Sequence, residues 1–426
     1  MRRSPLLVIF ITVFIDLIGF GIVIPVLPYY LESERFRATP LALGLLFSSY
    51  SVMQLIFSPV LGRWSDKYGR RPVLLLSLIG TGIGFCILGA ATTLTMLFAG
   101  RIFAGITGGN ISTAQAYIAD ITTPENRAQG MGIFGAAFGL GFIFGPAIGG
   151  ILSKWDISAP FYFAAALAFV NAVLLYFLLP ETVTPDHPAR ATPRGWGYFI
   201  QRLAEPKLAT VLSIYFLFVV AFSIMTTTFA LYTMYRFDYD AVHNGYLFAY
   251  IGALAVVIQG LLIGPLVKRW GELPLVVAGA SLLALGLAVL PYIGPGFYGG
   301  LPALLVVLAA FSVGNSFATP TLTSLASKSV SAAEQGGAMG VTQSAASLAR
   351  AVGPVIGGWL IYSATAPRHM DDSTLRATFW TAAAIMLAAL ALAVYFARSY
   401  AAGLATAGAS SASEPTSAEA KAGASP

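Results

Sequence analysis

Apolar stretches of about 20 residues recur along the chain from Leu6 to Phe396, separated by short segments rich in charged residues, proline and glycine. A helix of this length crosses a hydrocarbon core of about 30 Å. The pattern therefore predicts an all-α membrane protein with twelve spans. The first six are expected at 5–29, 42–62, 73–94, 96–119, 128–152 and 159–180, and the second six at 208–235, 244–267, 273–293, 300–327, 337–363 and 375–398.

Two polar segments divide the chain into domains. Residues 181–206 are too polar to lie in lipid, so they are predicted to form a cytoplasmic linker between an N-terminal six-helix bundle (1–180) and a C-terminal one (207–398). The sequence leaves open whether 196–203 forms a short interfacial helix or stays part of a flexible linker. Residues 399–426 are rich in Ala, Ser and Gly without apolar periodicity, which predicts a disordered cytoplasmic tail.

An internal repeat relates the two bundles. The charged turn at 62–72 recurs 202 positions later at 264–274, with two glycines and a proline at matching places. The segment GPAIGG at 145–150 recurs 208 positions later as GPVIGG at 353–358. A two-fold repeat of six spans, with the substrate path between the halves, is typical of carriers that work by alternating access.

Composition supports this reading and excludes several other classes. Of 426 residues, 57% are hydrophobic and 10% charged, against roughly 25% charged in soluble domains. The lone Cys86 excludes an internal disulfide framework and a multi-thiolate metal site. The chain has no P-loop motif, and its three histidines lie in connections, so neither an ATP motor, a cofactor nor a metal site is expected. No nucleophile with a histidine base lies in the interior, so an enzyme is not expected.

The distribution of basic residues predicts the orientation. Most of the 24 Lys and Arg residues lie at the termini and in the even-numbered connections, so both termini should face the cytoplasm. The net charge of +6 follows from this asymmetry rather than from nucleic-acid binding. Compact connections and the lack of organelle signals favour a bacterial inner membrane. The expected partners are a small-molecule substrate, protons and the lipid bilayer, and a monomer is expected.

Three charged residues lie inside predicted spans. Asp16 is the only acid well inside any span, which makes it the natural proton site. Arg101 in the fourth span lies at nearly the same depth, within roughly 4 Å at about 1.5 Å of rise per residue, so the two side chains are expected to pair. A static ion pair is the alternative to a proton-coupling role. Arg350 in the eleventh span has no acid in its own half, and whether it snorkels, pairs across the halves or attracts an anionic substrate group stays open.

Further candidates are glycines and neutral polar residues. The turn at 62–72 is predicted to do more than carry charge, because Gly62 and Gly69 permit a tight turn in which Asp66 caps a helix or pairs with an Arg. The glycines of the fifth span favour close helix packing or easy bending. Candidates for this helix are Gly141, Gly145, Pro146 and Gly149. Candidates for a substrate cavity are Gln54, Asn110, Gln115, Asn315, Gln343 and Arg350, with Asn110 and Asn315 as the preferred pair.

These motifs together resemble the Major Facilitator Superfamily, and within it the twelve-helix drug:proton antiporters, most closely the tetracycline exporter branch. The resemblance rests on the turn that begins at Gly62, the helix with Arg101 and the helix with Gly145-Pro146. It implies export by alternating access in exchange for protons. It also implies that the residues Asp66, Gly69 and Arg70 hold the halves together on the cytoplasmic side, with Asp66 facing the start of the eleventh span and Asp120 joining the cluster.

The same resemblance assigns Asp16 and Arg101 to proton coupling, and the glycines and proline of the fifth span to an antiporter. The chain departs from the tetracycline exporters in the third span, where Gly84 stands in place of an acid, and the ninth span also lacks one. A metal-chelated tetracycline would thus find fewer carboxylates here. The predicted function is export of small lipophilic drugs or metabolites in exchange for protons. The alternatives are a carrier of one sugar or organic anion, and a non-transporting receptor.

Overall fold

The computed structural model describes residues 5–122, 127–183, 205–296, 299–330, 335–362 and 371–412. The N-terminal half comprises α1 (Pro5–Glu32), α2 (Pro40–Tyr68), α3 (Arg70–Gly89), α4 (Leu94–Ile106), α5 (Asn110–Ile121), α6 (Arg127–Leu152) and α7 (Ala159–Leu178). The C-terminal half comprises α9 (Pro206–Phe237), α10 (Ala241–Val257), a π-helical turn (Ile258–Leu262), α11 (Ile263–Trp270), α12 (Glu272–Val289), α13 (Gly300–Lys328), α14 (Gln335–Ile361) and α15 (Asp372–Ala412). The candidate interfacial helix at 196–203 lies outside the described residues.

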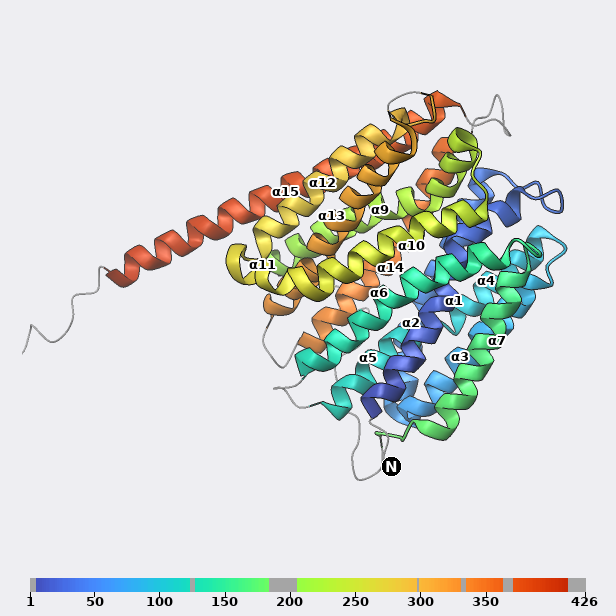
Figure 1. Cartoon of the computed structure of the whole chain (residues 1–426). Coiled ribbons are helices and arrows are strands. Elements are labelled where there is room, and N and C mark those ends of the chain that lie inside the picture. The colour runs from blue at the N-terminus through green and yellow to red at the C-terminus, as the bar shows by residue number, and fades with distance from the viewer. Residues whose placement is uncertain are drawn as a thin grey trace, which may run out of the picture.

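The helices account for the twelve predicted spans. Within the described residues, ten helical segments are long and apolar enough to cross a membrane, one of them being α10, the π-helical turn and α11 in continuous succession. The apolar segment Gly139–Leu152 of α6 supplies another span, and α4 and α5 together supply the twelfth. The prediction of an all-α fold with twelve spans in two halves is confirmed, and Figure 1 shows the halves as two helical bundles side by side.

The fourth span differs from the prediction because it is broken. A continuous helix was expected over 96–119, but α4 ends at Ile106 and α5 begins at Asn110. Gly108 and Gly109 are poor helix formers, and the Gly109 N–H donates to the Thr107 carbonyl over 2.8 Å instead of continuing the helical ladder. The break places the side chain of Asn110 at the start of a helix in the interior of the bundle.

The C-terminal tail also differs from the prediction, because α15 continues as a helix to Ala412 where disorder was expected from residue 399. The segment is rich in alanine, the strongest helix former, and propensity extends the helix where apolar burial cannot. Figure 1 shows this end of α15 projecting away from both bundles. Residues 413–426 lie outside the described residues.

The interface between the halves follows the internal repeat. In the N-terminal half α6 packs against α1 and also against α10 of the other half. In the C-terminal half α14 packs against α9 and also against α2 of the other half. Each glycine-rich helix therefore contacts the first helix of its own half and the second helix of the opposite half. Small residues let these backbones approach closely, which is a usual means of packing helices in lipid.

In the described structure the two halves contact each other at one end and along the middle of their helices. We call the end that carries the start of α1 the N-terminal face, and the end that carries the connections at 33–39, 153–158 and 238–240 the opposite face. At the opposite face the Tyr29 hydroxyl donates to the Tyr239 carbonyl over 2.7 Å. A Cβ added to Gly358 would lie 2.5 Å from the Pro40 carbonyl oxygen, and one added to Gly150 would lie 2.9 Å from the Ala241 carbonyl oxygen.

The N-terminal face is open by comparison. A Cβ added to Gly264 on α11 or to Gly340 on α14 would meet no described atom within 4 Å. None of the residues of α11 is buried. Figure 1 shows the bundles diverging toward the ends of α5 and α11. Within the described part of the chain, the structure is thus closed at the opposite face and open toward the N-terminal face.

Candidate functional site

Asp16 lies near the middle of α1 and is half-buried. The side chain of Asn110, at the start of α5, lies close enough to interact with its carboxyl group. Among the described residues, no ion pair within 4.0 Å joins Asp16 to a cation. The predicted pairing of Asp16 with Arg101 is therefore wrong for this conformation. The break between α4 and α5 is what brings Asn110 to the carboxyl group instead.

Arg101 on α4 is buried, with 4% of its surface exposed, and it stacks on aromatic rings of α2. Its guanidinium carbon lies 4.5 Å from the ring centre of Tyr50 and 5.7 Å from that of Phe47. Its Nε atom is buried without a hydrogen-bond partner in the described structure. A desolvated cation–π contact of this kind contributes about 2 kcal/mol or more. The Arg101 guanidinium, which was expected to reach Asp16 on α1, therefore packs against the aromatic rings of α2 instead.

Tyr50 connects the charged residues. Its hydroxyl accepts a hydrogen bond of 3.3 Å from Gln54 Nε2, which also donates to the Gly108 carbonyl over 3.2 Å. Asp16, Arg101 and Arg350 all act electrostatically on the Tyr50 phenol. Sequence reasoning missed Tyr50, and its only sequence signal is its position one helical turn before Gln54 on α2.

The C-terminal half contributes Arg350 and Tyr215. Arg350 on α14 is half-buried, and its Nη2 donates to Ser347 Oγ over 3.2 Å. Tyr215 on α9 and Tyr50 are the groups that act electrostatically on its guanidinium. Residues from six helices of the two halves therefore converge on one region. We call the following six residues the interior cluster: Asp16, Tyr50, Arg101, Asn110, Tyr215 and Arg350.

The other predicted cavity residues lie near this region or elsewhere. Gln54 supports Tyr50, as described above. Asn315 is half-buried, and its Oδ1 accepts a hydrogen bond of 2.9 Å from Thr319 Oγ1. Gln115 and Gln343 are half-buried as well. Asn110 and Asn315, the preferred cavity candidates, make different contacts: Asn110 faces Asp16, while Asn315 bonds within its own helix.

The turn between α2 and α3 contains a buried arginine. Arg70 is 2% exposed; its Nη1 bonds Asp66 Oδ1 at 2.5 Å and Ser65 Oγ at 2.7 Å, and its Nε bonds Asp120 Oδ2 at 2.9 Å. The Ser65 hydroxyl also donates to the Gly62 carbonyl over 2.8 Å. The predicted cluster is thus assembled within the N-terminal half. The side chains of residues 335 and 336, at the start of α14, lie outside the described part of the chain, and the contact of Asp66 with the start of the eleventh span stays a prediction.

Glu181 completes this turn and was missed by sequence reasoning. Its two carboxylate oxygens accept the backbone N–H groups of Arg70 and Arg71, at 2.8 and 3.0 Å, where α3 begins. A carboxylate in this position satisfies two free N–H groups and complements the helix dipole. Gly69 precedes them with φ +106°, and an added Cβ would collide with the Glu181 carboxylate. The first residues of the predicted linker therefore belong to the N-terminal half.

The repeated turn in the C-terminal half carries an ion pair of reversed polarity. Glu272 occupies the position 202 residues after Arg70, and Lys328 the position 208 residues after Asp120. Lys328 Nζ lies 2.8 Å from Glu272 Oε1. Gly271 before it has φ +79°, as Gly69 has a positive φ in the first copy. The repeat has thus kept the contact between the third-span start and the fourth-span end while exchanging the signs of its charges.

The glycines predicted for the fifth span lie against α1. A Cβ added to Gly141 would lie 2.5 Å from Leu17 Cβ, and one added to Gly145 would lie 2.7 Å from the Ile18 carbonyl oxygen. An added Cβ at Gly149 would approach Ile22 to 3.2 Å. The ring of Pro146 also lies against α1, 3.0 Å from a Cβ added to Gly21, while its carbonyl oxygen points to the other half, 2.6 Å from a Cβ added to Gly245 of α10. These residues connect α1, which carries Asp16, to the contact surface between α6 and α10. We call this surface and the one between α2 and α14 the seams between the halves.

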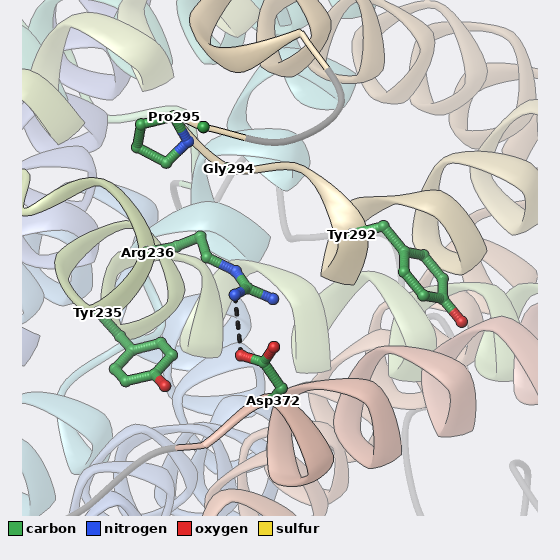
Figure 2. A pocket seen from close by; sticks show the side chains of 7 residues that line it. Tyr235, Arg236, Tyr292, Gly294, Pro295 and Asp372 are labelled. Carbon is green, nitrogen blue, oxygen red and sulfur yellow. Dashed lines mark ion pairs between the residues drawn. The ribbon is translucent and has the colours of Figure 1, made fainter.

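A separate pocket lies on the opposite face of the C-terminal half (Figure 2). It has a volume of about 660 Å³ and is lined by residues that include Tyr235, Tyr292 and Gly294. Arg236 at the end of α9 pairs with Asp372 at the start of α15, Nη1 to Oδ1 at 2.8 Å, and donates to the Pro291 carbonyl over 2.7 Å. This ion pair connects the end of α9 to the start of α15 within the C-terminal half, and neither residue belongs to the interior cluster.

Comparisons with known proteins identify the family. The sequence model of the Major Facilitator Superfamily matches residues 9–349 and 261–422. The chain is 34% identical to the class H tetracycline resistance protein of Pasteurella multocida, over 93% of this chain and 96% of that protein. It is 29% identical to multidrug resistance protein 2 of Bacillus subtilis (strain 168), over 84% and 89% of the two chains.

Solved structures agree with this assignment. The crystal structure of the human organic anion transporter MFSD10 (TETRAN) superposes with a TM-score of 0.70 at 26% identity, covering 92% of this chain and 99% of that one. The family resemblance seen in the three sequence motifs is confirmed. The chain belongs to the Major Facilitator Superfamily of membrane transporters.

Proposed function

We propose that this protein exports small, largely apolar molecules across a bacterial inner membrane in exchange for protons, with Asp16 as the proton-carrying group. The family membership and the relatives named as tetracycline and multidrug resistance proteins support drug export. The observation that carries the proton assignment is the position of Asp16, a half-buried carboxyl group in the membrane-spanning interior that faces Asn110 and shares a cluster with residues of the other half. An ionisable residue in this position is functional by default.

The chemistry of exchange follows from the formal charges of the cluster. With Asp16 ionised, Arg101 and Arg350 leave a net charge of one positive unit, and a proton on Asp16 raises it by one more. Because a charge in a low-dielectric interior interacts strongly with its neighbours, protonation changes how the cluster binds a polar substrate group. A substrate group that binds the Asp16 carboxylate competes directly with the proton. This competition is what an exchanger needs.

Alternating access is supported by the one-sided closure of the structure. The seams between α2 and α14 and between α6 and α10 close the opposite face, while the N-terminal face is open. With the N-terminal face in the cytoplasm, as the basic residues predict, this is the conformation that takes substrate from inside the cell. Rocking of the two halves would open the opposite face, and Gly141, Gly145, Pro146 and Gly149 lie where α6 must adjust against α1.

The turn between α2 and α3 is proposed to stabilise the alternative state. In that state the N-terminal face closes and brings the turn toward the C-terminal half. Arg70 and Asp120 hold Asp66 in place, while Gly62 and Gly69 provide the geometry of the turn. Asp66 is then positioned to act on the start of α14 across the closing face. The monomer contains both halves of the site and is proposed as the transporting unit.

Tetracycline is the second candidate substrate, favoured by the 34% identity to the class H tetracycline resistance protein. At Gly84, where the resemblance to the tetracycline exporters predicts an acid, the structure leaves no room for a larger side chain. Gly84 of α3 packs against α4, where an added Cβ would lie 2.8 Å from Ala104 Cβ and 3.0 Å from the Gly100 carbonyl oxygen. A carboxylate side chain does not fit there without moving α4. A chelated metal would therefore depend on Asp16 alone in this region.

Substrate uptake into proteoliposomes tests the proposal. Vesicles loaded with acidic buffer are diluted into neutral buffer, and uptake of neutral drugs, lipophilic cations, organic anions and tetracycline with and without Mg²⁺ is followed. Export in exchange for protons predicts accumulation that collapses when a protonophore removes the pH gradient. Uptake that is the same with and without the gradient would show a uniporter. Uptake of tetracycline alone would identify a dedicated tetracycline exporter.

A further inference from the structure

Two charges of opposite sign in the interior cluster have no counter-ion in the described structure. Asp16 on α1 has no cation within 4.0 Å, and Arg350 on α14 has no carboxylate within that distance. The hydrogen bond that Arg350 donates goes to the neutral hydroxyl of Ser347. Isolated charges in the membrane-spanning interior are costly, and native proteins keep them where they bind something.

These two charges do not satisfy each other, although both act on the same phenol. Phe20, one turn after Asp16 on α1, has its ring centre 6.4 Å from that of Tyr50, and Gly44 of α2 packs against Pro354, one turn after Arg350 on α14. Both charges therefore lie near Tyr50, and both act on its phenol. The group that interacts with the Asp16 carboxyl is the neutral amide of Asn110. The Arg350 guanidinium interacts with Tyr50 and with Tyr215 of its own half. Arg101, the third charge, is occupied by the rings of α2.

The surroundings of Arg350 suit an anionic ligand group, and those of Asp16 suit a cationic one. A guanidinium offers a planar fork of donors that matches a carboxylate, and phenolic hydroxyls beside it add donors. A carboxylate with a neutral amide beside it binds an ammonium group. The ring of Phe20 on α1 lies 6.4 Å from that of Tyr50 and 6.0 Å from that of Phe142, centroid to centroid, and these rings supply an apolar surface.

We infer that the interior cluster binds zwitterionic amphiphiles, with the ammonium group on Asp16 of the N-terminal half and the anionic group on Arg350 of the C-terminal half. This inference rests on the proposed function, because it names the substrate class of the same site. A ligand held in this way bridges the two halves. Its ammonium group competes with the proton for Asp16, which gives exchange, whereas an anion without an ammonium group does not compete.

Four probes built on one naphthalene scaffold separate the two contacts. A naphthalene that carries an aminoalkyl chain and a carboxylate is the zwitterion, its methyl ester is the cation, its N-acetyl derivative is the anion, and the N-acetyl methyl ester is neutral. Binding to the purified full chain in detergent is measured by equilibrium dialysis, so that no transport is needed. The zwitterion is expected to bind about ten-fold or more tightly than the cation and the anion, since each lost charge-assisted contact is worth at least that factor.

Variants assign each contact to its residue. Arg350→Gln should remove the preference of zwitterion over cation, and Arg350→Lys should keep part of it because the charge remains. Asp16→Asn should remove the preference of zwitterion over anion. Arg269→Gln removes the same charge from the exposed helix α11 and should leave both ratios unchanged. Lowering the pH protonates Asp16, so binding of the zwitterion should weaken relative to binding of the anion in the parent. Asp16→Asn should not show this pH effect.

The outcomes distinguish this inference from the proposed function. A zwitterion that binds no better than the neutral probe overturns the inference, as does an Arg350→Gln variant that weakens all four probes equally. Neither result affects proton-driven uptake of drugs in proteoliposomes. Conversely, if the binding ratios appear as expected but uptake ignores the pH gradient, the zwitterion site stands and the proposed exchange fails.

Discussion

The guanidinium of Arg101 lies over the ring of Tyr50, with 4.5 Å between the guanidinium carbon and the ring centre. This contact holds a membrane-embedded cation on a neighbouring helix and away from the carboxyl group of Asp16. The Tyr50 hydroxyl, held by Gln54, then lies among charges from both halves. The aromatic ring therefore holds the cation that was expected to pair with Asp16, the acid that we assign to proton exchange.

Replacing Tyr50 should reveal this role. Tyr50→Phe keeps the ring under Arg101 and loses only the hydroxyl, so a small loss of stability is expected. Tyr50→Leu removes the nearer ring and leaves the buried cation with only the more distant ring of Phe47, which should cost about 2 kcal/mol. Thermal unfolding in detergent measures both variants. Equal stability of the two would show that the ring does not hold Arg101.

Gly69 should tolerate no side chain. Its backbone lies in a region essentially restricted to glycine, and an added Cβ would collide with the Glu181 carboxylate. Gly69→Ala is therefore expected to cost about 1–3 kcal/mol from backbone strain alone. The matched control is Gly264→Ala in α11, which meets open space and should stabilise its helix by up to about 1 kcal/mol. A Gly69→Ala protein as stable as the control would contradict the described geometry.

The two ion pairs of opposite polarity should differ in strength. Arg70 is buried, so Asp120→Ala strips a buried cation of one carboxylate and should cost roughly 3 kcal/mol. Lys328 is 65% exposed, so Lys328→Ala should cost less than about 1 kcal/mol. Exchanging the residues by combining Glu272→Lys with Lys328→Glu should recover the stability that Glu272→Lys alone loses. Equal losses of stability from Asp120→Ala and Lys328→Ala would show that burial does not decide how much each ion pair contributes.

The closed seam at the opposite face should depend on its glycines. Gly150→Leu places a side chain where only 2.9 Å separates a Cβ from the Ala241 carbonyl oxygen, so the halves should be forced apart there. Spin labels at Glu34→Cys and Asp371→Cys, in a Cys86→Ser background, report the distance across that face. The distance should increase in Gly150→Leu and stay unchanged in Gly340→Leu, whose side chain enters open space. An unchanged distance between the spin labels in both variants would show that Gly150 does not lie in the contact between the halves.

The sequence predicted the architecture well because membrane crossing depends on length and polarity alone. Apolar stretches set the twelve spans, and the repeated turns at 62–72 and 264–274 set the two halves. The pairing of Asp16 with Arg101 failed because depth along a helix does not fix the direction in which a side chain points. Tyr50, which turned out to hold Arg101, looks like any aromatic residue of a membrane span.

Other parts of the site could not be read from local sequence. Glu181 caps a helix that begins more than 100 residues earlier, and no periodic pattern connects the two. The break before Asn110 was signalled by Gly108-Gly109, but a glycine pair is also common in continuous membrane helices. The contacts across the two halves, such as Tyr29 with Tyr239, depend on the conformation as well as on the sequence.

The most direct test of proton exchange is substrate-dependent proton flux in proteoliposomes, recorded with a trapped pH indicator for the parent and for Asp16→Asn. Glu34→Gln serves as a control, because it removes an acid whose side chain is 92% exposed at the opposite face. We expect the parent and the control to move protons when a transported drug is added, and Asp16→Asn to move none. Full proton flux in Asp16→Asn would contradict the assignment of Asp16 as the coupling group.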